Sequence, residues 1–405
     1  MRISTHRARV SRALLGATAL ILSISCSSLV HAQTAWPAKP LEPNEPPAVR
    51  VGMGFGSAVG LSYGRVLVGA PSTDGHGAAY VFSQQGANWP QTQKLLAPDM
   101  GPGTFGDRLD VDLQSALISD TTRNLVYYFE KPDFLTSPFR ATAILRGGTE
   151  LFGSTVALDG CVGLVASGAH GSPIKKGYVH VYNRCPSGRW TFKGSISASD
   201  ATGPDYFGYS IALSSATLMI GAPYAGNRAG AVYFYTYANG VWTLKQKITQ
   251  NIPFADNQFG RGVGFRNGLA VIGAPNTISG TNEGALELYK LVNGTWVYSS
   301  TQVAPPESNG TIAQYGAKIQ VTDTRVIVSS QPKSFYNMGG SLTVLRRSGD
   351  TITFEKHFPP EDRHSVLGTA FDADGQGLVI GDATRPAIPG PGTFGGGADI
   401  YQMPP

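Results

Sequence analysis

The chain has 405 residues, a length that fits two or three ordinary domains or one large all-β architecture. Glycine contributes 51 residues and aromatic residues 10%, whereas charged residues make up only 15%, which is typical of many short strands joined by tight turns. Four arginines lie in the first twelve positions, and beyond them 28 basic residues balance 27 acidic ones. A nearly neutral chain without a Lys/Arg stripe argues against nucleic acid as a partner.

The N-terminal segment has the organisation of a secretory signal peptide. The arginines precede an apolar run over 13–24, and the small residues Val30-His31-Ala32 follow it. We therefore expect cleavage after Ala32 and a mature chain of residues 33–405 that is secreted, periplasmic or held at the cell surface. No later stretch approaches the roughly 20 apolar residues that span a bilayer. Lipid attachment at Cys26 stays open, although Ser23 stands where a lipoprotein signal has a large aliphatic residue.

A three-part signal recurs along the mature chain at spacings of 47 to 56 residues. Each unit opens with an aromatic or aliphatic residue followed by glycine, at Phe55-Gly56, Phe105-Gly106, Phe152-Gly153, Phe207-Gly208, Phe259-Gly260, Tyr315-Gly316 and Leu367-Gly368. A Gly-Ala-Pro string or a decayed copy stands in the middle, as in "VLVGAP", and an alternating strand such as "GAAYVF" closes the unit. A regular period of this size indicates a repeat architecture.

Each unit has the length of one four-stranded antiparallel sheet, so the seven units predict an all-β, seven-bladed β-propeller in a single domain over 33–405. After the last closing strand, "GADIYQMPP", the sequence provides no fourth strand for the seventh sheet. The mature N-terminus, "AWPAKPLEPNE", is similar to the fourth strand of the first blade, "NWPQTQKLLAPD". We therefore expect residues from about Trp36 to Pro43 to complete the seventh sheet and close the ring.

Two cysteines remain in the predicted mature chain, and an exported protein meets an oxidising compartment. Cys161 begins the second strand of blade three and Cys185 ends its third strand. The two strands form an antiparallel hairpin that sets the cysteines opposite one another, which predicts a Cys161–Cys185 disulfide.

These repeats resemble the FG-GAP family, best known from the propeller of integrin alpha subunits, over about residues 36 to 402. The resemblance implies a propeller with a role in binding or adhesion. Integrin blades carry calcium loops of spaced acids, whereas the corresponding turns here are short and lack those acids, so we expect no calcium or other cofactor. The nearest match is Asp372-Ala373-Asp374-Gly375, which an ordinary β-turn explains equally well.

Catalytic signatures are missing from the sequence. It contains no G-x-S-x-G, H-E-x-x-H or P-loop string, and its histidines form no ligand set. Acidic residues recur near the blade ends, and a pair of them at the right separation could hydrolyse glycosides. They are Asp110, Asp112, Asp120, Asp205, Asp256 and Asp382. Because spacing along the chain brings no two of them together, we interpret them as turn acids and the protein as a non-enzyme.

The longest loops join strands two and three of each blade or lead into the next blade, and both kinds emerge on one face of the ring. Exposed aromatic residues beside arginine on this loop-rich face suit recognition of a protein or a glycan. The candidate ligand residues are Tyr224, Arg228, Phe254, Phe335 and Tyr336. The hypothesis is a monomeric, exported binding or adhesion module, with a structural scaffold or a propeller hydrolase as alternatives. Asn293 and Asn309 are glycosylation acceptors if the host glycosylates secreted proteins.

Overall fold

A computed structural model describes most of the chain that follows the predicted signal peptide. The described residues are 36–46, 50–133, 137–148, 151–167, 176–184, 188–201, 203–251, 256–276, 284–305, 314–331, 340–359, 367–385 and 395–404. The predicted signal peptide and Cys26 lie outside them. Within the described part of the chain, no helix is long and apolar enough to cross a bilayer.

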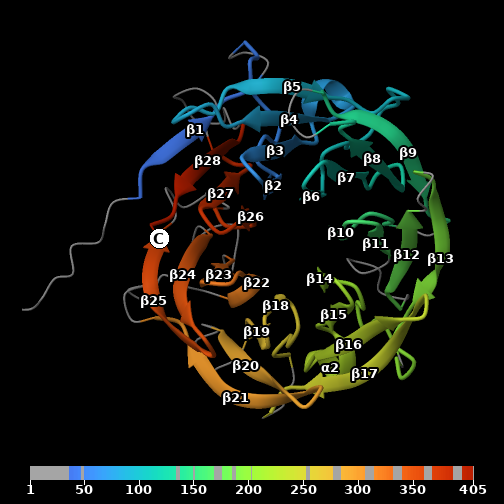
Figure 1. The fold of residues 1–405 in the computed structure, drawn as a ribbon, viewed down its shortest axis with the longest axis vertical. Coiled ribbons are helices and arrows are strands. Elements are labelled where there is room, and N and C mark those ends of the chain that lie inside the picture. Colours follow the sequence, from blue (N-terminus) through green and yellow to red (C-terminus); the bar gives the residue numbers. More distant parts are fainter. Residues whose placement is uncertain are drawn as a thin grey trace, which may run out of the picture. The chain divides into compact units, whose positions relative to one another are not determined.

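Seven four-stranded antiparallel sheets stand around a central axis, as predicted (Figure 1). From the innermost strand outward, blade 1 consists of β2 (Ala58–Ser62), β3 (Arg65–Ala70), β4 (Ala78–Ser83) and β5 (Gln91–Leu95). Blade 2 consists of β6 (Leu109–Asp112), β7 (Ser115–Asp120), β8 (Leu125–Glu130) and β9 (Arg140–Arg146). Blade 3 consists of β10 (Val156–Asp159), β11 (Val162–Ser167), β12 (Tyr178–Arg184) and β13 (Trp190–Ile196). Blade 4 consists of β14 (Ser210–Ser214), β15 (Thr217–Ala222), β16 (Ala231–Ala238) and β17 (Val241–Thr249). Blade 5 consists of β18 (Val263–Arg266), β19 (Leu269–Ala274), β20 (Ala285–Val292) and β21 (Thr295–Val303). Blade 6 consists of β22 (Tyr315–Val321), β23 (Arg325–Ser330), β24 (Ser341–Ser348) and β25 (Thr351–Phe358). Blade 7 is β26 (Ala370–Ala373), β27 (Gly377–Asp382), β28 (Gly397–Gln402) and β1 (Ala38–Leu41), and two one-turn helices, η1 (Thr73–Gly75) and α2 (Ala225–Arg228), lie in loops.

The predicted ring closure is confirmed, because β1 is the outermost strand of blade 7 and pairs antiparallel with β28, beside which it runs in Figure 1. Trp36 packs edge-on against Phe358 of blade 6, with ring centroids 5.7 Å apart. The buried guanidinium of Arg325 lies 5.8 Å from the Trp36 ring centroid and also donates to the Pro404 carbonyl. Both ends of the described chain are therefore held by the same blade 6 side chain.

Each blade is buried on both faces of its second strand. All residues of β3 and β19 are buried, which accounts for their continuous aliphatic sequences. The phenylalanine of the FG signal packs against an aromatic residue of the third strand. Phe55 lies 5.6 Å from Tyr80, and Phe105 lies 5.4 Å from Tyr127, both in edge-to-face geometry. The FG aromatic residue is thus a core anchor within its own blade.

The two glycine signals interlock neighbouring blades. Gly106 has a φ of 96°, and its carbonyl oxygen lies against Gly69 of the preceding blade so closely that a Cβ on Gly69 would overlap it. At the ring closure, Gly56 of blade 1 occupies the same place against Gly381 of blade 7. The FG glycine of one blade therefore packs onto the GAP glycine of the blade before it, which explains why the two signals recur together.

Hydrogen bonds cover the open edges of the innermost strands. A side chain of one blade accepts a backbone N–H of the next, and the direction is the same at successive seams. Asp372 accepts from Leu61 at 2.7 Å, Ser62 from Leu113 at 3.1 Å, Asp110 from Leu158 at 2.7 Å and Asp112 from Gly160 at 2.8 Å. Such bonds satisfy backbone groups that a strand at the centre of the ring would otherwise leave unpaired.

The register of β11 and β12 differs by one residue from the expected one. The N–H of Arg184 donates to the Cys161 carbonyl at 2.8 Å, so Arg184 and not Cys185 stands opposite Cys161. The position of Cys185 itself lies outside the described residues, so the register is shown only up to Arg184. Cys161 is exposed and Cys185 lies outside the described residues, so the disulfide stays a prediction.

Candidate functional site

Two of the five predicted ligand residues form a stack on the loop-rich face. Tyr224 precedes α2 and Arg228 ends it, and the Arg228 guanidinium lies 4.9 Å from the Tyr224 ring centroid. On Tyr224 packs Tyr206 from the β13–β14 loop, with centroids 4.2 Å apart, and the Arg228 Nε lies 3.0 Å from Asp256 Oδ1. We call Tyr206, Tyr224, Arg228 and Asp256 the Tyr–Arg stack. Its tyrosines are partly exposed and its charged residues exposed.

The backbone of the Tyr–Arg stack is unusual for residues of this size. Tyr206, Arg228 and Asp256 have φ angles of 55°, 66° and 69°, a region that non-glycine residues rarely adopt. Backbone hydrogen bonds hold this geometry, since Tyr224 N donates to the Asp205 carbonyl at 3.2 Å and Gln258 N donates to that of Arg228 at 2.9 Å. Such conformations carry a cost that the surrounding structure must offset, and they cluster at binding sites.

Sequence reasoning missed Tyr206 and the role of Asp256. Tyr206 directly precedes the FG phenylalanine of blade 4. Because it stands beside a repeat signal, its partial exposure was not predicted. Asp256 was predicted to be a turn acid, and the structure pairs it with the predicted ligand residue Arg228. The remaining candidates, Phe254, Phe335 and Tyr336, lie outside the described residues. Asn293 occupies the exposed turn between β20 and β21, and Asn309 lies outside the described residues.

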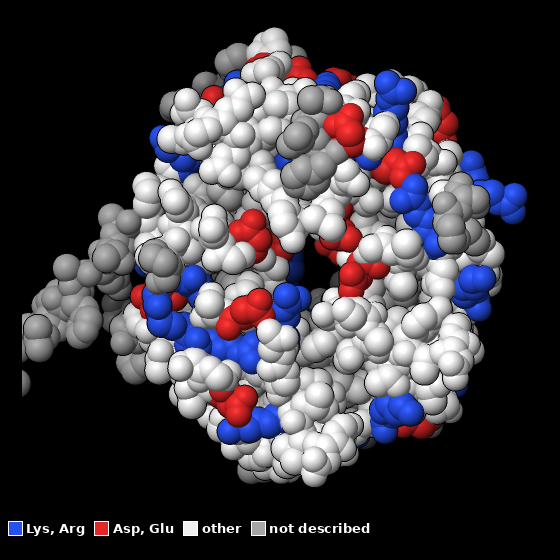
Figure 2. Space-filling model, viewed as in Figure 1, with Lys and Arg blue, Asp and Glu red and all other residues white. Residues whose placement is uncertain are grey.

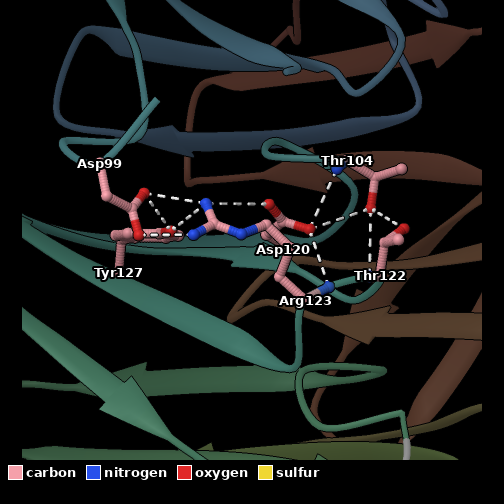
Figure 3. Close-up of polar contacts among 6 residues, drawn as sticks. All are labelled: Asp99, Thr104, Asp120, Thr122, Arg123 and Tyr127. Atoms are coloured by element: carbon pink, nitrogen blue, oxygen red, sulfur yellow. Dashed lines mark hydrogen bonds and ion pairs between the residues drawn. The ribbon is translucent and has the colours of Figure 1, made fainter. Parts of the chain in front are cut away.

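A polar cluster lies at the start of blade 2, around the predicted turn acid Asp120 (Figure 3). The side chain of Asp120 is fully buried at the end of β7, and its Oδ1 accepts the N–H groups of Thr104 at 3.0 Å and Arg123 at 3.2 Å. Arg123 forms two parallel hydrogen bonds to Asp99, of 2.8 and 2.6 Å, and a third to the Tyr127 hydroxyl at 3.0 Å. Asp120 thus organises a turn, as predicted.

The electrostatics of this cluster also indicate a structural role. Hydrogen bonding to Arg123 lowers the pKa of Asp99 to about 2, and burial raises the pKa of Tyr127. The Asp120 Oδ2 has no hydrogen bond, but Arg123 lies 3.9 Å away and compensates its charge. The loop glycines Gly101 and Gly103 lie directly against Arg123 and Asp120, so no space for a ligand remains there.

Acidic side chains surround the central opening of the ring, with basic side chains beside them (Figure 2). Asp110 on β6 and Asp372 on β26 belong to blades 2 and 7, which are not neighbours. Both residues stand on the innermost strands of their blades, and the charge of Asp372 helps to raise the pKa of Asp110. Lys318 on β22 belongs to the same group, because its pKa responds to both acids. We call Asp110, Asp372 and Lys318 the channel group.

The pKa values of the channel group are displaced toward the neutral forms. Burial first, and the Asp372 charge second, raise the pKa of Asp110 to about 7. Burial likewise raises the pKa of Asp372 and lowers that of Lys318. The Lys318 ammonium donates to the Phe371 carbonyl at 3.0 Å, and Gln320 Nε2 donates to Asp372 Oδ1 at 2.5 Å. Burial thus favours the neutral form of both carboxyls, although both already accept backbone N–H groups.

In the Asp372–Gly375 segment, Asp372 lies on β26, and Asp374 forms the ordinary turn that sequence reasoning kept as an explanation. Asp374 Oδ1 accepts the N–H groups of Gln376 at 2.9 Å and Gly377 at 2.7 Å. Asp205 is buried, and burial raises its pKa. Asp382 Oδ1 accepts hydrogen bonds from the backbone N–H and the hydroxyl of Thr384. Across the ranges that the structure describes, no three acidic, histidine or cysteine side chains gather into a metal-binding group.

Comparison with solved structures supports the fold. A crystal structure of a Lactobacillus plantarum protein matches with a TM-score of 0.53 and 13% identity, over 75% of this chain and 84% of that one. A Bacteroides uniformis protein proposed to be a 6-phosphogluconolactonase matches with 0.52 and 9%, over 75% and 85%. A hypothetical selenium-binding protein from Sulfolobus tokodaii matches with 0.51 and 9%, over 73% and 76%. At these identities the likeness concerns the fold alone.

Comparison with protein families finds the repeat itself. Residues 190–235 match the FG-GAP repeat, a segment that runs from the start of β13 to Tyr235 on β16 and contains Tyr206, Tyr224 and Arg228. No curated protein matches the chain. The chain is thus a seven-bladed β-propeller whose residues 190–235 match the FG-GAP repeat.

Proposed function

We propose that this protein is an exported, non-catalytic binding or adhesion module that recognises a protein or glycan through the loop-rich face of its propeller. Export rests on the signal peptide predicted for residues 1–32, and recognition rests on the Tyr–Arg stack. The partner is an extracellular or cell-envelope molecule, and the propeller acts as a monomer.

The Tyr–Arg stack is the observation that carries this proposal. Its two tyrosines and its arginine offer ring faces and a guanidinium, the side chains most enriched where binding energy is concentrated. Three of its four members adopt positive φ, which core packing of a propeller blade does not require. The Asp256 carboxylate orients Arg228, so the surface is preorganised before a partner arrives.

The test is capture of partners from an envelope or secreted fraction, run in parallel with a glycan array. Tyr224→Ala and Arg228→Ala are expected to weaken binding by roughly tenfold or more. Tyr63→Ala is the matched control, because Tyr63 is also an exposed tyrosine at positive φ but lies in the β2–β3 turn, at the opposite end of the blades. Equal binding by all three variants would contradict recognition through this stack, and the scaffold hypothesis would then account better for the fold.

A hydrolase is the second candidate, and the raised pKa of Asp110 is the observation that favours it. A general acid works best when its pKa lies near the working pH, and Asp110 and Asp372 form a carboxyl pair at one opening. The binding proposal stands first because both carboxyls already accept backbone N–H groups that join the blades. Turnover of a glycoside or lactone panel that Asp110→Asn abolishes, without loss of folding, would favour the hydrolase.

A further inference from the structure

A groove of about 230 Å³ lies on the outer side of the ring, between the outermost strands of blades 2 and 3. Figure 1 shows these strands, β9 and β13, following one another around the rim. The groove is lined by Tyr182, Trp190 and Phe192 and by the exposed Arg146 and Arg189. Phe192 is 54% exposed, which is unusual for an aromatic residue that touches other rings. None of its lining residues is acidic.

Two other seams carry a glutamine at this position. At the seam of blades 1 and 2, the Gln93 amide binds both backbone groups of Phe139, donating to its carbonyl at 2.8 Å and accepting its N–H at 2.9 Å. At the seam of blades 4 and 5, Gln246 binds Trp296 in the same way, at 2.8 Å for both bonds. We call this pair of bonds the glutamine clasp.

Ala143 takes the place of the clasp glutamine at the seam of blades 2 and 3. Ala143 is equivalent in its blade to Gln93 and Gln246. Each of the three residues pairs with the third-strand residue just before a β-bulge. Ala143 lines the groove, and its methyl group cannot reach Trp190 as a glutamine amide would. Gly194 takes the equivalent position at the next seam, so the clasp belongs to particular seams and not to every repeat.

The missing clasp leaves a hydrogen-bonding edge. Trp296 pairs with Leu291, and Gln246 binds the N–H and C=O of Trp296 from the side away from β20. Trp190 pairs with Arg184 in the same register relative to its own bulge. Its N–H and C=O therefore lie on the outer edge of β13, beside the groove. A backbone donor and acceptor at a sheet edge are what an extended peptide pairs with.

We propose that this groove is a docking site for an extended acidic peptide segment of a partner protein, separate from the Tyr–Arg stack. The peptide backbone pairs with the edge of β13 at Trp190 and replaces the clasp. An apolar or amide side chain enters the groove against Trp190 and Phe192, and a carboxylate pairs with Arg146 or Arg189. Arg146 and Arg189 are both exposed, and neither makes an ion pair with another residue in the described part of the chain.

The positive charges of Arg146 and Arg189, which form the rim of the groove, favour an acidic peptide. Arginine binds carboxylates through two parallel hydrogen bonds, and two arginines with no acid among the lining residues disfavour a basic or neutral peptide. Backbone pairing, an apolar wall and a cationic rim together fit an acidic peptide.

The experiment uses the intact protein and an array of short peptides rich in Asp, Glu, Gln and Leu, matched by an array with Lys in place of each acid. Ala143→Gln is expected to restore the clasp, fill the groove and lower binding to the acidic array by roughly tenfold, as loss of one or two hydrogen bonds would. The Arg146→Glu, Arg189→Glu double variant is expected to lose the same binding. Arg140→Glu, on the same strand but outside the groove, is the matched control.

The outcomes separate this proposal from the alternatives. Ala143→Gln should also unfold at a higher urea concentration than the wild type, which excludes misfolding as the cause of lost binding. Equal binding to both arrays, no binding to either, or undiminished binding by Ala143→Gln would overturn the proposal. Binding of polygalacturonate but not of peptides would assign the groove to an acidic glycan instead. Tyr224→Ala should leave groove binding unchanged, so failure of one site is distinguishable from failure of the other.

Discussion

Replacing Asp110 by asparagine tests whether the channel group couples folding to pH. The folded pKa of Asp110 is about 7, against an ordinary value of 3.8. Between these values the folded protein holds a proton that the unfolded chain has released. Stability falls with rising pH wherever the folded state binds more protons, so wild-type stability should decline from about pH 4 to about pH 7 and then level off. Asparagine does not titrate and keeps a carbonyl oxygen for the Leu158 N–H.

The size of this change in unfolding free energy follows from the pKa shift of Asp110. About three pKa units would correspond to about 4 kcal/mol for a group fully removed from water. Because Asp110 is partly exposed in the channel, we halve this value and expect about 2 kcal/mol. Asp110→Asn should therefore gain about 2 kcal/mol relative to the wild type between pH 4 and pH 8.

The assay is urea unfolding of both proteins at a series of pH values. Asp372→Asn provides a second test, because removing the Asp372 charge should lower the pKa of Asp110. The stability of this variant should therefore level off at a lower pH than that of the wild type. Stability curves of wild type and Asp110→Asn that run parallel from pH 4 to pH 8 would refute the reasoning. They would mean that Asp110 is ionised in the folded protein throughout, with its charge carried by the Leu158 and Val111 N–H groups.

Three further perturbations test the blade seams, the ring closure and the cysteines. Gly69→Ala places a methyl group against the Gly106 carbonyl and should cost about 2–3 kcal/mol in urea unfolding, whereas Gly375→Ala, with open space around it, should cost little; equal effects would contradict the seam packing. Leu41→Ala, in a side chain only 2% exposed, should cost about 2–5 kcal/mol and speed amide exchange in β28; unchanged exchange would show that β1 does not hold the ring closed. Thiol labelling of the secreted protein should find neither Cys161 nor Cys185 reactive until a reductant is added, and two reactive thiols would disprove the disulfide.

The sequence by itself determined the architecture, because every part of it is signalled locally and repeated. The glycines of the FG and GAP signals are needed where backbones touch, and the alternating third strands are needed in every blade, so each copy reinforces the same interpretation. The similarity of the segment around Trp36 to a fourth strand was likewise sufficient to predict that β1 closes the seventh sheet.

The tertiary structure decided which residues meet across blades. Asp110 and Asp372 stand on blades 2 and 7, and Ala143 and Trp190 line one groove between blades 2 and 3 because of the position of each β-bulge. Within blade 4, the loop conformations bring Tyr206 and Tyr224 together. The same dependence on register placed Arg184 opposite Cys161. A strand's own pattern specifies which face is buried but not its exact partner on another strand, because a shift of one residue preserves the composition while moving every side chain to the other face. Which loops share one face of the ring was therefore readable in the sequence, whereas the contacts among their side chains were not.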